Sequence, residues 1–128
     1  MHKIDRIKNM WLAIYDPEQD AAAVVEEYFH PEYEQCINGV RMSRSDYINH
    51  VIVQKNNMTI THIDYIHSLE KGDELWSIYQ PKGKTAQGSD IETEVIAYFL
   101  FQGSQVIKIY GQVRLIKGSY ADADMQSE

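Results

Sequence analysis

The 128-residue chain has little cysteine, proline or positive charge, and it has no long apolar run. Its single cysteine, Cys36, cannot form an internal disulfide, so a reducing cytoplasm is the expected location. No apolar segment approaches the roughly 18 residues that a membrane span needs. The N-terminal residues MHKIDRIKNMW also lack the apolar core of a secretory signal. These absences predict a cytoplasmic protein with no membrane partner.

Acidic residues outnumber basic residues by 19 to 12, which gives a formal net charge of −7. Nucleic-acid binding needs Lys and Arg gathered on one face, and the chain has no such cluster. The metal-binding spacings H-x-x-x-H and C-x-x-C are absent, and His62 and His67 are predicted to face opposite ways on a strand. The glycines form no phosphate-binding loop. We therefore expect no nucleic-acid partner, no metal and no cofactor.

Length and composition predict one folded domain and a short tail. The chain is about one domain long, and 44% apolar with 24% charged residues is ordinary for a globular protein. Residues 119–128, SYADADMQSE, are acidic and short of large apolar side chains. The predicted organisation is a single domain over residues 1–118 and a flexible acidic tail over residues 119–128.

Helical periodicity dominates the first 30 residues. Apolar side chains at spacings of three and four predict a first helix, and they are Ile4, Ile7, Trp11 and Ile14. The motif DPEQ predicts the start of a second helix, with Asp16 as its cap and Pro17 in its first position. This helix continues through Tyr28 and must end near His30, because Pro31 disfavours helix in the residue before it.

A short hairpin and a third helix follow. Residues 33–37 and 40–42 are predicted to be two strands around a tight turn at Asn38-Gly39. The motif SRSD at residues 43–46 is a capping pattern that opens a helix ending at residues 55–57. The predicted inner face of this helix consists of Tyr47, Ile48, Val51 and Ile52.

After Met58 the apolar period changes to two, which predicts strands. Four segments rich in β-branched and aromatic residues follow, over residues 59–69, 74–80, 91–101 and 106–116. Glycine turns between them predict antiparallel hairpins, and PKGKTAQGSD (81–90) is the longest predicted loop, a candidate mobile rim. Helices first and strands afterwards predict an α+β fold with the N-terminal helices packed on the sheet.

The last predicted hairpin can be aligned through its turn. A three-residue loop over residues 103–105 places Gln102 opposite Val106, and further along the strands it places Tyr98 opposite Tyr110. One face then forms the predicted core, consisting of Ile91, Val95, Ala97, Phe99, Phe101, Ile107, Ile109, Val113 and Leu115.

The opposite face of this hairpin predicts an interface. It places Glu94 opposite Arg114 at one end. Its centre consists of Ile96, Tyr98, Leu100, Tyr110 and Gln112. Because this centre is too apolar for a plain solvent face, we expect a homodimer through it.

The stretch YFHPEYEQCING (28–39), followed by SDYINHV (45–51), resembles a recurring block of the nuclear transport factor two-like superfamily. The shared pattern is an aromatic residue, P-x-Y, a polar pair, N/D-G and a helix with F/Y-I-x-H, and the layout matches over residues 4–117. The similar branch is the SnoaL-like one, with polyketide cyclases and ketosteroid isomerases. The resemblance implies a strongly curved antiparallel sheet that wraps around the helices as a cone (a cystatin-like α+β barrel), an apolar pocket and common dimers.

The ketosteroid isomerase resemblance also implies a site, which this chain does not complete. The family's general base is an aspartate three residues before the hairpin glycine, and that position is Cys36. A thiol with an ordinary pKa of about 8.5 is a poor replacement for a carboxylate base. Tyr15 lies where the family has an oxyanion donor, but residues 95–101 contain no second acid. Proton abstraction of the steroid-isomerase kind is therefore not expected.

The best acid–base set in the sequence is His62, Asp64 and Tyr79. His62 and Asp64 share a strand face, and a tight turn at residues 71–72 would place Tyr79 opposite Asp64. A carboxylate that orients a histidine or tyrosine in an apolar site can act as a general acid or base. The alternative is a hydrogen-bonded pair on a solvent face, because a register slip of one residue moves all three side chains to the other face.

The other predicted pocket residues come from several elements. They are Trp11, Tyr15, Phe29, Tyr33, Gln35, Cys36, His50 and Phe99. Gln35 or Tyr33 would supply a polar group, whereas His50 is expected to be structural and Cys36 a small wall residue; core packing explains the aromatics equally well. Two functions stay open: a module that binds a small apolar molecule, or a metal-independent isomerase, cyclase or lyase using acid–base chemistry.

Overall fold

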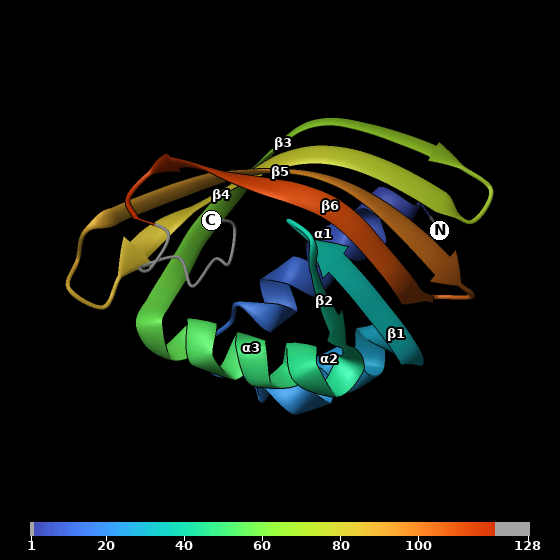
Figure 1. The fold of residues 1–128 in the computed structure, drawn as a ribbon, viewed down its shortest axis with the longest axis horizontal. Helices are drawn as coiled ribbons and strands as arrows, with labels where there is room; N and C mark the ends of the chain where they lie inside the picture. Colours follow the sequence, from blue (N-terminus) through green and yellow to red (C-terminus); the bar gives the residue numbers. More distant parts are fainter. Residues whose placement is uncertain (1, 120–128) are drawn as a thin grey trace.

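The structure is a computed structural model that describes residues 2–119, so most of the predicted tail lies outside the described residues. The elements in chain order are α1 (Lys3–Ile14), α2 (Ala21–Tyr28), β1 (Phe29–Ile37), β2 (Val40–Ser43), α3 (Arg44–Asn57), β3 (Met58–Lys71), β4 (Glu74–Thr85), β5 (Asp90–Gln102) and β6 (Gln105–Lys117). The three helices lie on one side of a curved, unclosed sheet (Figure 1). The predicted α+β class is confirmed.

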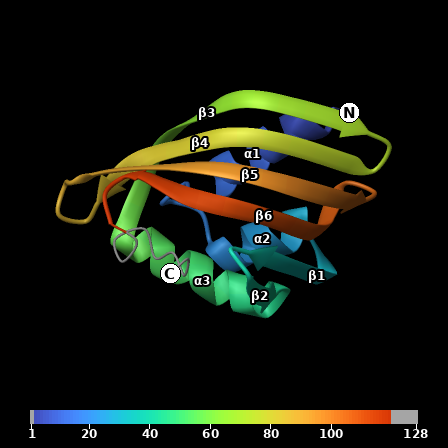
Figure 2. The same cartoon turned by 45° about the horizontal axis from the view of Figure 1, so that its top comes forward.

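All six strands belong to one sheet in the order β2-β1-β6-β5-β4-β3. Figure 2 shows the four long strands running side by side, with β1 and β2 continuing the sheet beyond β6. Every described pair is antiparallel except β1 with β6, which is parallel. The sheet is therefore mixed, where the sequence predicted an antiparallel one, because the hairpin β1–β2 joins the edge of a strand far along the chain.

The first helix lies as predicted, but the second begins later than the DPEQ motif suggested. The Asp16 carboxylate accepts a hydrogen bond from the Glu18 backbone N–H at 2.9 Å and so closes a turn. Asp20 caps the helix instead, accepting from the Ala23 backbone N–H at 2.9 Å. Asp16 and Asp20 are both suitable cap residues. Asp20 is the cap because it directly precedes the apolar run of the helix.

The hairpin and the third helix confirm their local signals. Asn38 and Gly39 have φ values of 52° and 80°, the left-handed pair that a two-residue hairpin turn needs. Ser43 and Asp46 form a reciprocal capping box. The predicted inner face of α3 is partly wrong, because Ile52 is 44% exposed while Tyr47 and Val51 are buried.

The predicted long loop over residues 81–90 is wrong. Residues 81–85 continue β4, where Pro81 lies opposite Ile63 and Gly83 opposite Ile60, so only residues 86–89 connect β4 to β5. The proline and glycine residues of this segment are typical of a loop, and for that reason the sequence predicted one. Both residue types are tolerated in a strand where its pairing is irregular, and here the register shifts between Ile60 and His62.

The last hairpin has the predicted register in its centre, with Tyr98 opposite Tyr110 and Glu94 opposite Arg114. Its turn differs, because Gln102 pairs with Gln105 rather than with Val106, and an irregularity between Leu100 and Phe101 restores the register. Val106 is consequently buried where Ile107 was predicted.

Gly83 is the glycine whose neighbours leave least room for a side chain. A Cβ at this position would lie 2.0 Å from the Thr59 carbonyl oxygen and 2.9 Å from Ile60 Cα, both backbone atoms of β3. Gly83→Ala must push β3 away from β4, so we expect the free energy of unfolding in urea to fall by about 3 kcal/mol.

The matched control is Gly103→Ala. Gly103 has a φ of 64° and nothing within 4 Å of the position that a Cβ would take, so alanine there should cost only about 1 kcal/mol of backbone strain. Equal losses for the two variants would contradict the close approach of β3 and β4 at Gly83.

Candidate functional site

A cavity of about 150 Å³ lies between α1, α3 and the face of the sheet that they cover. Its apolar wall comes mainly from the strands and includes Ile63, Ile91, Val95, Ile109 and Val113. Typical ligand pockets are larger, at about 300–1,000 Å³, but an engineered apolar cavity of about 150 Å³ binds benzene. The cavity therefore accommodates a molecule of about one ring.

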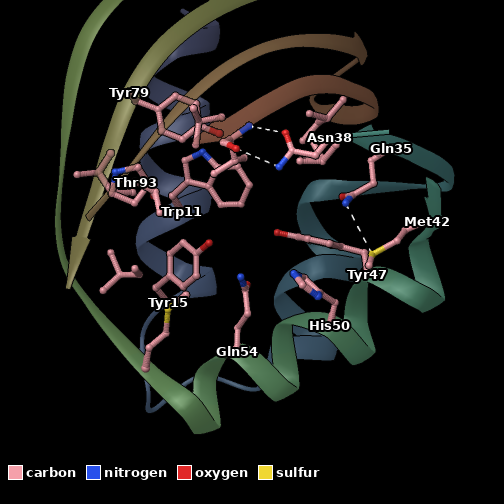
Figure 3. Close-up of a pocket in the computed structure, with 18 of the residues that line it drawn as sticks. Trp11, Tyr15, Gln35, Asn38, Met42, Tyr47, His50, Gln54, Tyr79 and Thr93 are labelled. Carbon is pink, nitrogen blue, oxygen red and sulfur yellow. Dashed lines mark hydrogen bonds between the residues drawn. The ribbon is translucent and has the colours of Figure 1, made fainter. Parts of the chain in front are cut away.

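Helical spacing directs the polar side chains into this cavity. Trp11 and Tyr15 are four residues apart at the end of α1, and their rings stack with centroids 6.0 Å apart. Tyr47, His50 and Gln54 follow each other at intervals of three and four on α3, which places them on one face of the helix. Figure 3 shows these side chains converging on the cavity from the two helices.

Three tyrosine hydroxyls belong to the cavity wall. Burial raises the pKa of Tyr15 to about 12. Burial raises the pKa of Tyr47 and of Tyr79 well above the ordinary value, and each is raised further by neighbouring tyrosines. All three phenols are therefore neutral at physiological pH and keep a proton to donate.

Two amides of the wall are already engaged. Gln35 Oε1 accepts a hydrogen bond from the Tyr33 hydroxyl at 2.7 Å, and Gln35 Nε2 lies 3.8 Å from the Met42 sulfur. The Asn38 amide donates to the Val113 carbonyl at 3.0 Å and accepts from the Val113 N–H at 2.8 Å. Asn38 thus joins the β1–β2 turn to β6, as the dashed lines in Figure 3 show.

The Trp11 indole nitrogen is a buried donor that has no hydrogen-bond partner within the described chain. It lies beside the Tyr79 hydroxyl, closely enough to lower the pKa of that phenol slightly against the larger effect of burial. The contact nevertheless falls short of hydrogen-bond geometry, so we count the indole N–H as unsatisfied. Such groups are uncommon in folded proteins and call for an explanation.

His50 is the one histidine among the described residues of the cavity wall. None of its members is Asp, Glu, Lys or Arg. Over residues 2–119 there is also no group of three or more His, Cys, Asp or Glu side chains placed to hold a metal ion. The cavity thus offers neutral hydrogen-bond donors in an apolar surrounding.

No protein-family model matches the chain, and no curated protein matches it. Solved structures do match. A hypothetical protein from Catenulispora acidiphila with a ketosteroid isomerase-like fold, solved with trimethylamine, has a TM-score of 0.70, with 10% identity over 98% of this chain and 95% of that chain. An NTF2-like protein of unknown function from an Exiguobacterium species has a TM-score of 0.67, with 17% identity over 88% and 98%. A protein assigned as a SnoaL-like polyketide cyclase from a Jannaschia species has a TM-score of 0.65, with 14% identity over 85% of each chain.

The chain has the nuclear transport factor two-like fold. At identities this low, the likeness shows the fold alone. The resemblance predicted from the sequence is confirmed as a likeness of fold. Within residues 2–119, no helix is both long and apolar enough to cross a membrane.

The nuclear transport factor two-like fold brings four of the predicted pocket residues to the cavity, namely Trp11, Tyr15, Gln35 and His50. Three others, Phe29, Tyr33 and Phe99, belong to the buried core behind the wall. Phe29 packs edge-on against Tyr33 at 4.6 Å, and Phe99 lies 6.4 Å from the Tyr79 ring. These aromatic side chains fill space in the core and do not border the cavity.

Cys36 also lies away from the cavity. It follows Gln35 along β1, and successive strand residues point to opposite faces, so Cys36 shares the face of its partner Tyr110. The thiol is buried. The position that carries the base in ketosteroid isomerases is therefore not directed at the cavity here.

The structure does not assemble the predicted set of His62, Asp64 and Tyr79. Tyr79 lies opposite Tyr65 and is buried, whereas Asp64 lies opposite Gln80 with its side chain 46% exposed. The turn comprises Gly72 and Asp73, one residue later than predicted, which changes the pairing of β3 with β4. A register shift after Tyr65 reverses only part of that change, so Tyr79 pairs with Tyr65 and not with Asp64.

His62 and Asp64 lie near each other on the exposed face of the sheet, with 3.8 Å between His62 Nε2 and Asp64 Oδ2. A hydrogen bond from Lys82, whose Nζ is 2.8 Å from Asp64 Oδ2, holds the pKa of the Asp64 carboxyl below its usual value. This is the arrangement of a solvent-side ion pair, and only Tyr79 of the three borders the cavity.

Several wall residues were not predicted from the sequence as pocket residues, among them Asn38, Tyr47, Gln54 and Thr93. A signal for two of them exists, because Tyr47, His50 and Gln54 share one helical face. The predicted inner face of α3 emphasised apolar residues, and Gln54 was missed for that reason.

Proposed function

We propose that this protein binds a small, largely apolar molecule of about one ring in the cavity between α1, α3 and the sheet. The supporting observation is an apolar wall interrupted by a few neutral donors around about 150 Å³ of space. Such a combination is typical of sites where apolar contact supplies affinity and a few polar groups supply orientation. The trimethylamine complex of a protein with this fold supports a small ligand.

Tryptophan fluorescence tests this function. The chain has two tryptophans, of which Trp11 borders the cavity and Trp76 is 53% exposed on the outer face of the sheet. In the Trp76→Phe variant, cyclohexanone should change the emission of Trp11 along a saturable curve. A dissociation constant on the order of 0.1–1 mM is expected, because so few ligand atoms limit the affinity. A linear, non-saturating change would contradict binding.

The second candidate function is a metal-independent isomerase, cyclase or lyase. It is favoured by the placement of His50 near three neutral phenols, because an imidazole can exchange a proton while a phenol stabilises the charge that develops. Exchange of the α-protons of cyclohexanone in D₂O separates the two candidates. Saturable binding without exchange above the buffer rate favours the binding module, and exchange that His50→Gln abolishes favours the enzyme.

We also propose that the protein forms a homodimer through the outer face of the sheet. This face carries exposed Trp76, Ile96 and Tyr110, and the Trp76 and Tyr98 rings lie 5.0 Å apart. Pairing across the strands continues this surface from Leu69 through Trp76 and Tyr98 to Tyr110. The helices lie on the other face (Figure 1), so a second copy is the partner that would cover an apolar, self-complementary patch.

Tyr98→Asp should disrupt this dimer, because it would bury an unpaired charge next to Glu74, which now accepts a hydrogen bond from the Tyr98 hydroxyl at 2.6 Å. We expect monomers or insoluble protein in analytical ultracentrifugation at tens of micromolar. Tyr98→Phe, which loses only the hydroxyl, should remain dimeric. Wild-type protein that sediments as a monomer would refute the interface.

A further inference from the structure

We propose that Lys55 is a latch that controls access to the cavity. Its ammonium ties the connection between α1 and α2, residues 15–20, to the end of α3, and a ligand enters or leaves when this tie breaks. The inference rests on the proposed binding function and adds the route by which the site fills and empties.

The first observation is the pair of hydrogen bonds that the Lys55 ammonium makes. Its Nζ donates to the backbone carbonyl oxygens of Asp16 and Gln19, at 2.8 Å each. Both acceptors lie in residues 15–20, whereas Lys55 lies in the last turn of α3. Hydrogen bonds from a charged donor are stronger than those between neutral groups. One side chain therefore joins two segments that are far apart in the chain.

The second observation is the position of the latch beside the cavity wall. Tyr15 is the first residue of the connection, and Gln54 directly precedes Lys55; both border the cavity. Figure 3 shows both side chains pointing into the cavity. Both are half-buried, whereas Trp11, one turn earlier on α1, is only 7% exposed. The wall therefore approaches the surface where the latch holds its two sides together.

The connection depends on this latch for its attachment to α3. Within residues 2–119, the other hydrogen bonds of residues 15–20 are local ones, such as that from the Gln19 backbone N–H to the Asp16 carbonyl oxygen at 3.2 Å. Every described hydrogen bond from this segment to a part of the chain outside α1 and α2 comes from Lys55. A segment held by so few contacts opens at a low cost in free energy.

The α3 side of the latch is held independently. The Asn57 carbonyl oxygen accepts a hydrogen bond at 2.9 Å from the backbone N–H of Ala86, which lies in the connection between β4 and β5. The chain then continues directly into β3 at Met58, which also borders the cavity. Breaking the Lys55 contacts should therefore move residues 15–20 away from a fixed α3 and open a path beside Tyr15.

Quenching of Trp11 fluorescence by acrylamide tests the latch without any ligand. Trp76→Phe leaves Trp11 as the only tryptophan, and the quencher reaches this buried ring when the wall opens. Adding Lys55→Met keeps a long unbranched side chain but removes the ammonium. The bimolecular quenching constant should then rise about three- to tenfold, because losing a hydrogen bond from a charged group shifts the opening equilibrium by a factor of this order.

Two further variants assign the effect to the latch. Lys71→Met makes the same substitution at the end of β3 that is remote from α3, and it should leave the quenching constant unchanged. Lys55→Gln has a neutral side chain that is too short to reach both carbonyl oxygens, and it should raise the constant as Lys55→Met does. This variant keeps the test available if Lys55→Met folds poorly.

The ligand supplies a second measurement. In Lys55→Met the release of cyclohexanone should speed up by the same factor as the quenching, measured from the NMR line shapes of the wall methyl groups. The dissociation constant should change by less than about twofold, because Lys55 does not border the cavity and the open state remains a minor population. A faster exchange at nearly constant affinity is the property of a latch and not of a residue that contacts the ligand.

The outcomes separate this inference from the proposed function. Unchanged quenching in Lys55→Met, or an equal rise in Lys71→Met, would overturn the latch while the proposed binding function stands. Faster quenching without faster release of cyclohexanone would also overturn it, because the ligand would then use another route. Faster quenching in a protein that binds no cyclohexanone would contradict the proposed function but support the control of access by Lys55.

Discussion

Asn38→Ala is expected to lower the free energy of unfolding by about 3 kcal/mol. The alanine removes two hydrogen bonds to the Val113 backbone, worth about 1 kcal/mol each, and it must adopt the left-handed conformation at an additional cost of about 1 kcal/mol. The contacts join residues 75 apart in the chain, so their loss should loosen the attachment of the β1–β2 hairpin to β6. Urea unfolding followed by circular dichroism measures the change.

The matched variant Asn38→Gly separates the two causes. Glycine adopts the positive φ of 52° without strain, so it should lose only the hydrogen bonds and cost about 2 kcal/mol. If neither variant lowers the free energy of unfolding by an amount that urea titrations can resolve, the side-chain bridge from Asn38 to β6 does not hold the hairpin.

Val113→Phe is expected to abolish ligand binding without destabilising the fold. Val113 borders the cavity, and phenylalanine would place a ring in the space that a one-ring ligand needs. Cyclohexanone affinity should fall by more than about tenfold, because the side chain and the ligand compete for one volume. Stability should change by less than 1 kcal/mol, whereas a tightly packed site would lose about 1–3 kcal/mol on overpacking.

Ile116→Phe is the control for this variant. Ile116 lies on the same strand, is 43% exposed and does not border the cavity, so the added ring should leave both binding and stability unchanged. A loss of several kcal/mol in Val113→Phe would contradict the cavity even if no ligand were known.

The elements that the sequence predicted well are those set by local chemistry. The Ser43–Asp46 capping box and the Asn38-Gly39 turn act within four residues, and each appears where its motif lies. The apolar period of two likewise identified the long strands, because side-chain alternation is a property of each strand alone. Such signals do not depend on what the rest of the chain does.

The features that could not be predicted depend on distant pairing. The parallel contact of β1 with β6 joins segments separated by one helix and four strands. The register shift after Tyr65 places Asp64 opposite Gln80, and a local count of residues from the turn does not reveal it. A single such shift decided that Tyr79 borders the cavity and Asp64 does not.

The cavity itself could be anticipated only in part. The sequence predicted three of these aromatic residues, Phe29, Phe99 and Trp11, to line the pocket. Only Trp11 borders the cavity, whereas Phe29 and Phe99 are packed inside the core. Whether apolar side chains meet or leave a void depends on the curvature of the sheet and the distance of α3 from it, and composition specifies neither.

The most direct measurement of the central claim, that the cavity binds a small neutral molecule, is a methyl-resolved NMR titration with cyclohexanone. We predict saturable shifts for the methyl groups of the wall residues Ile63, Ile91, Val95 and Ile109, and none for the outer residues Ile66, Ile96 and Ile116. Shifts confined to the outer residues, or no shift of any wall methyl at ligand concentrations in the millimolar range, would contradict the claim.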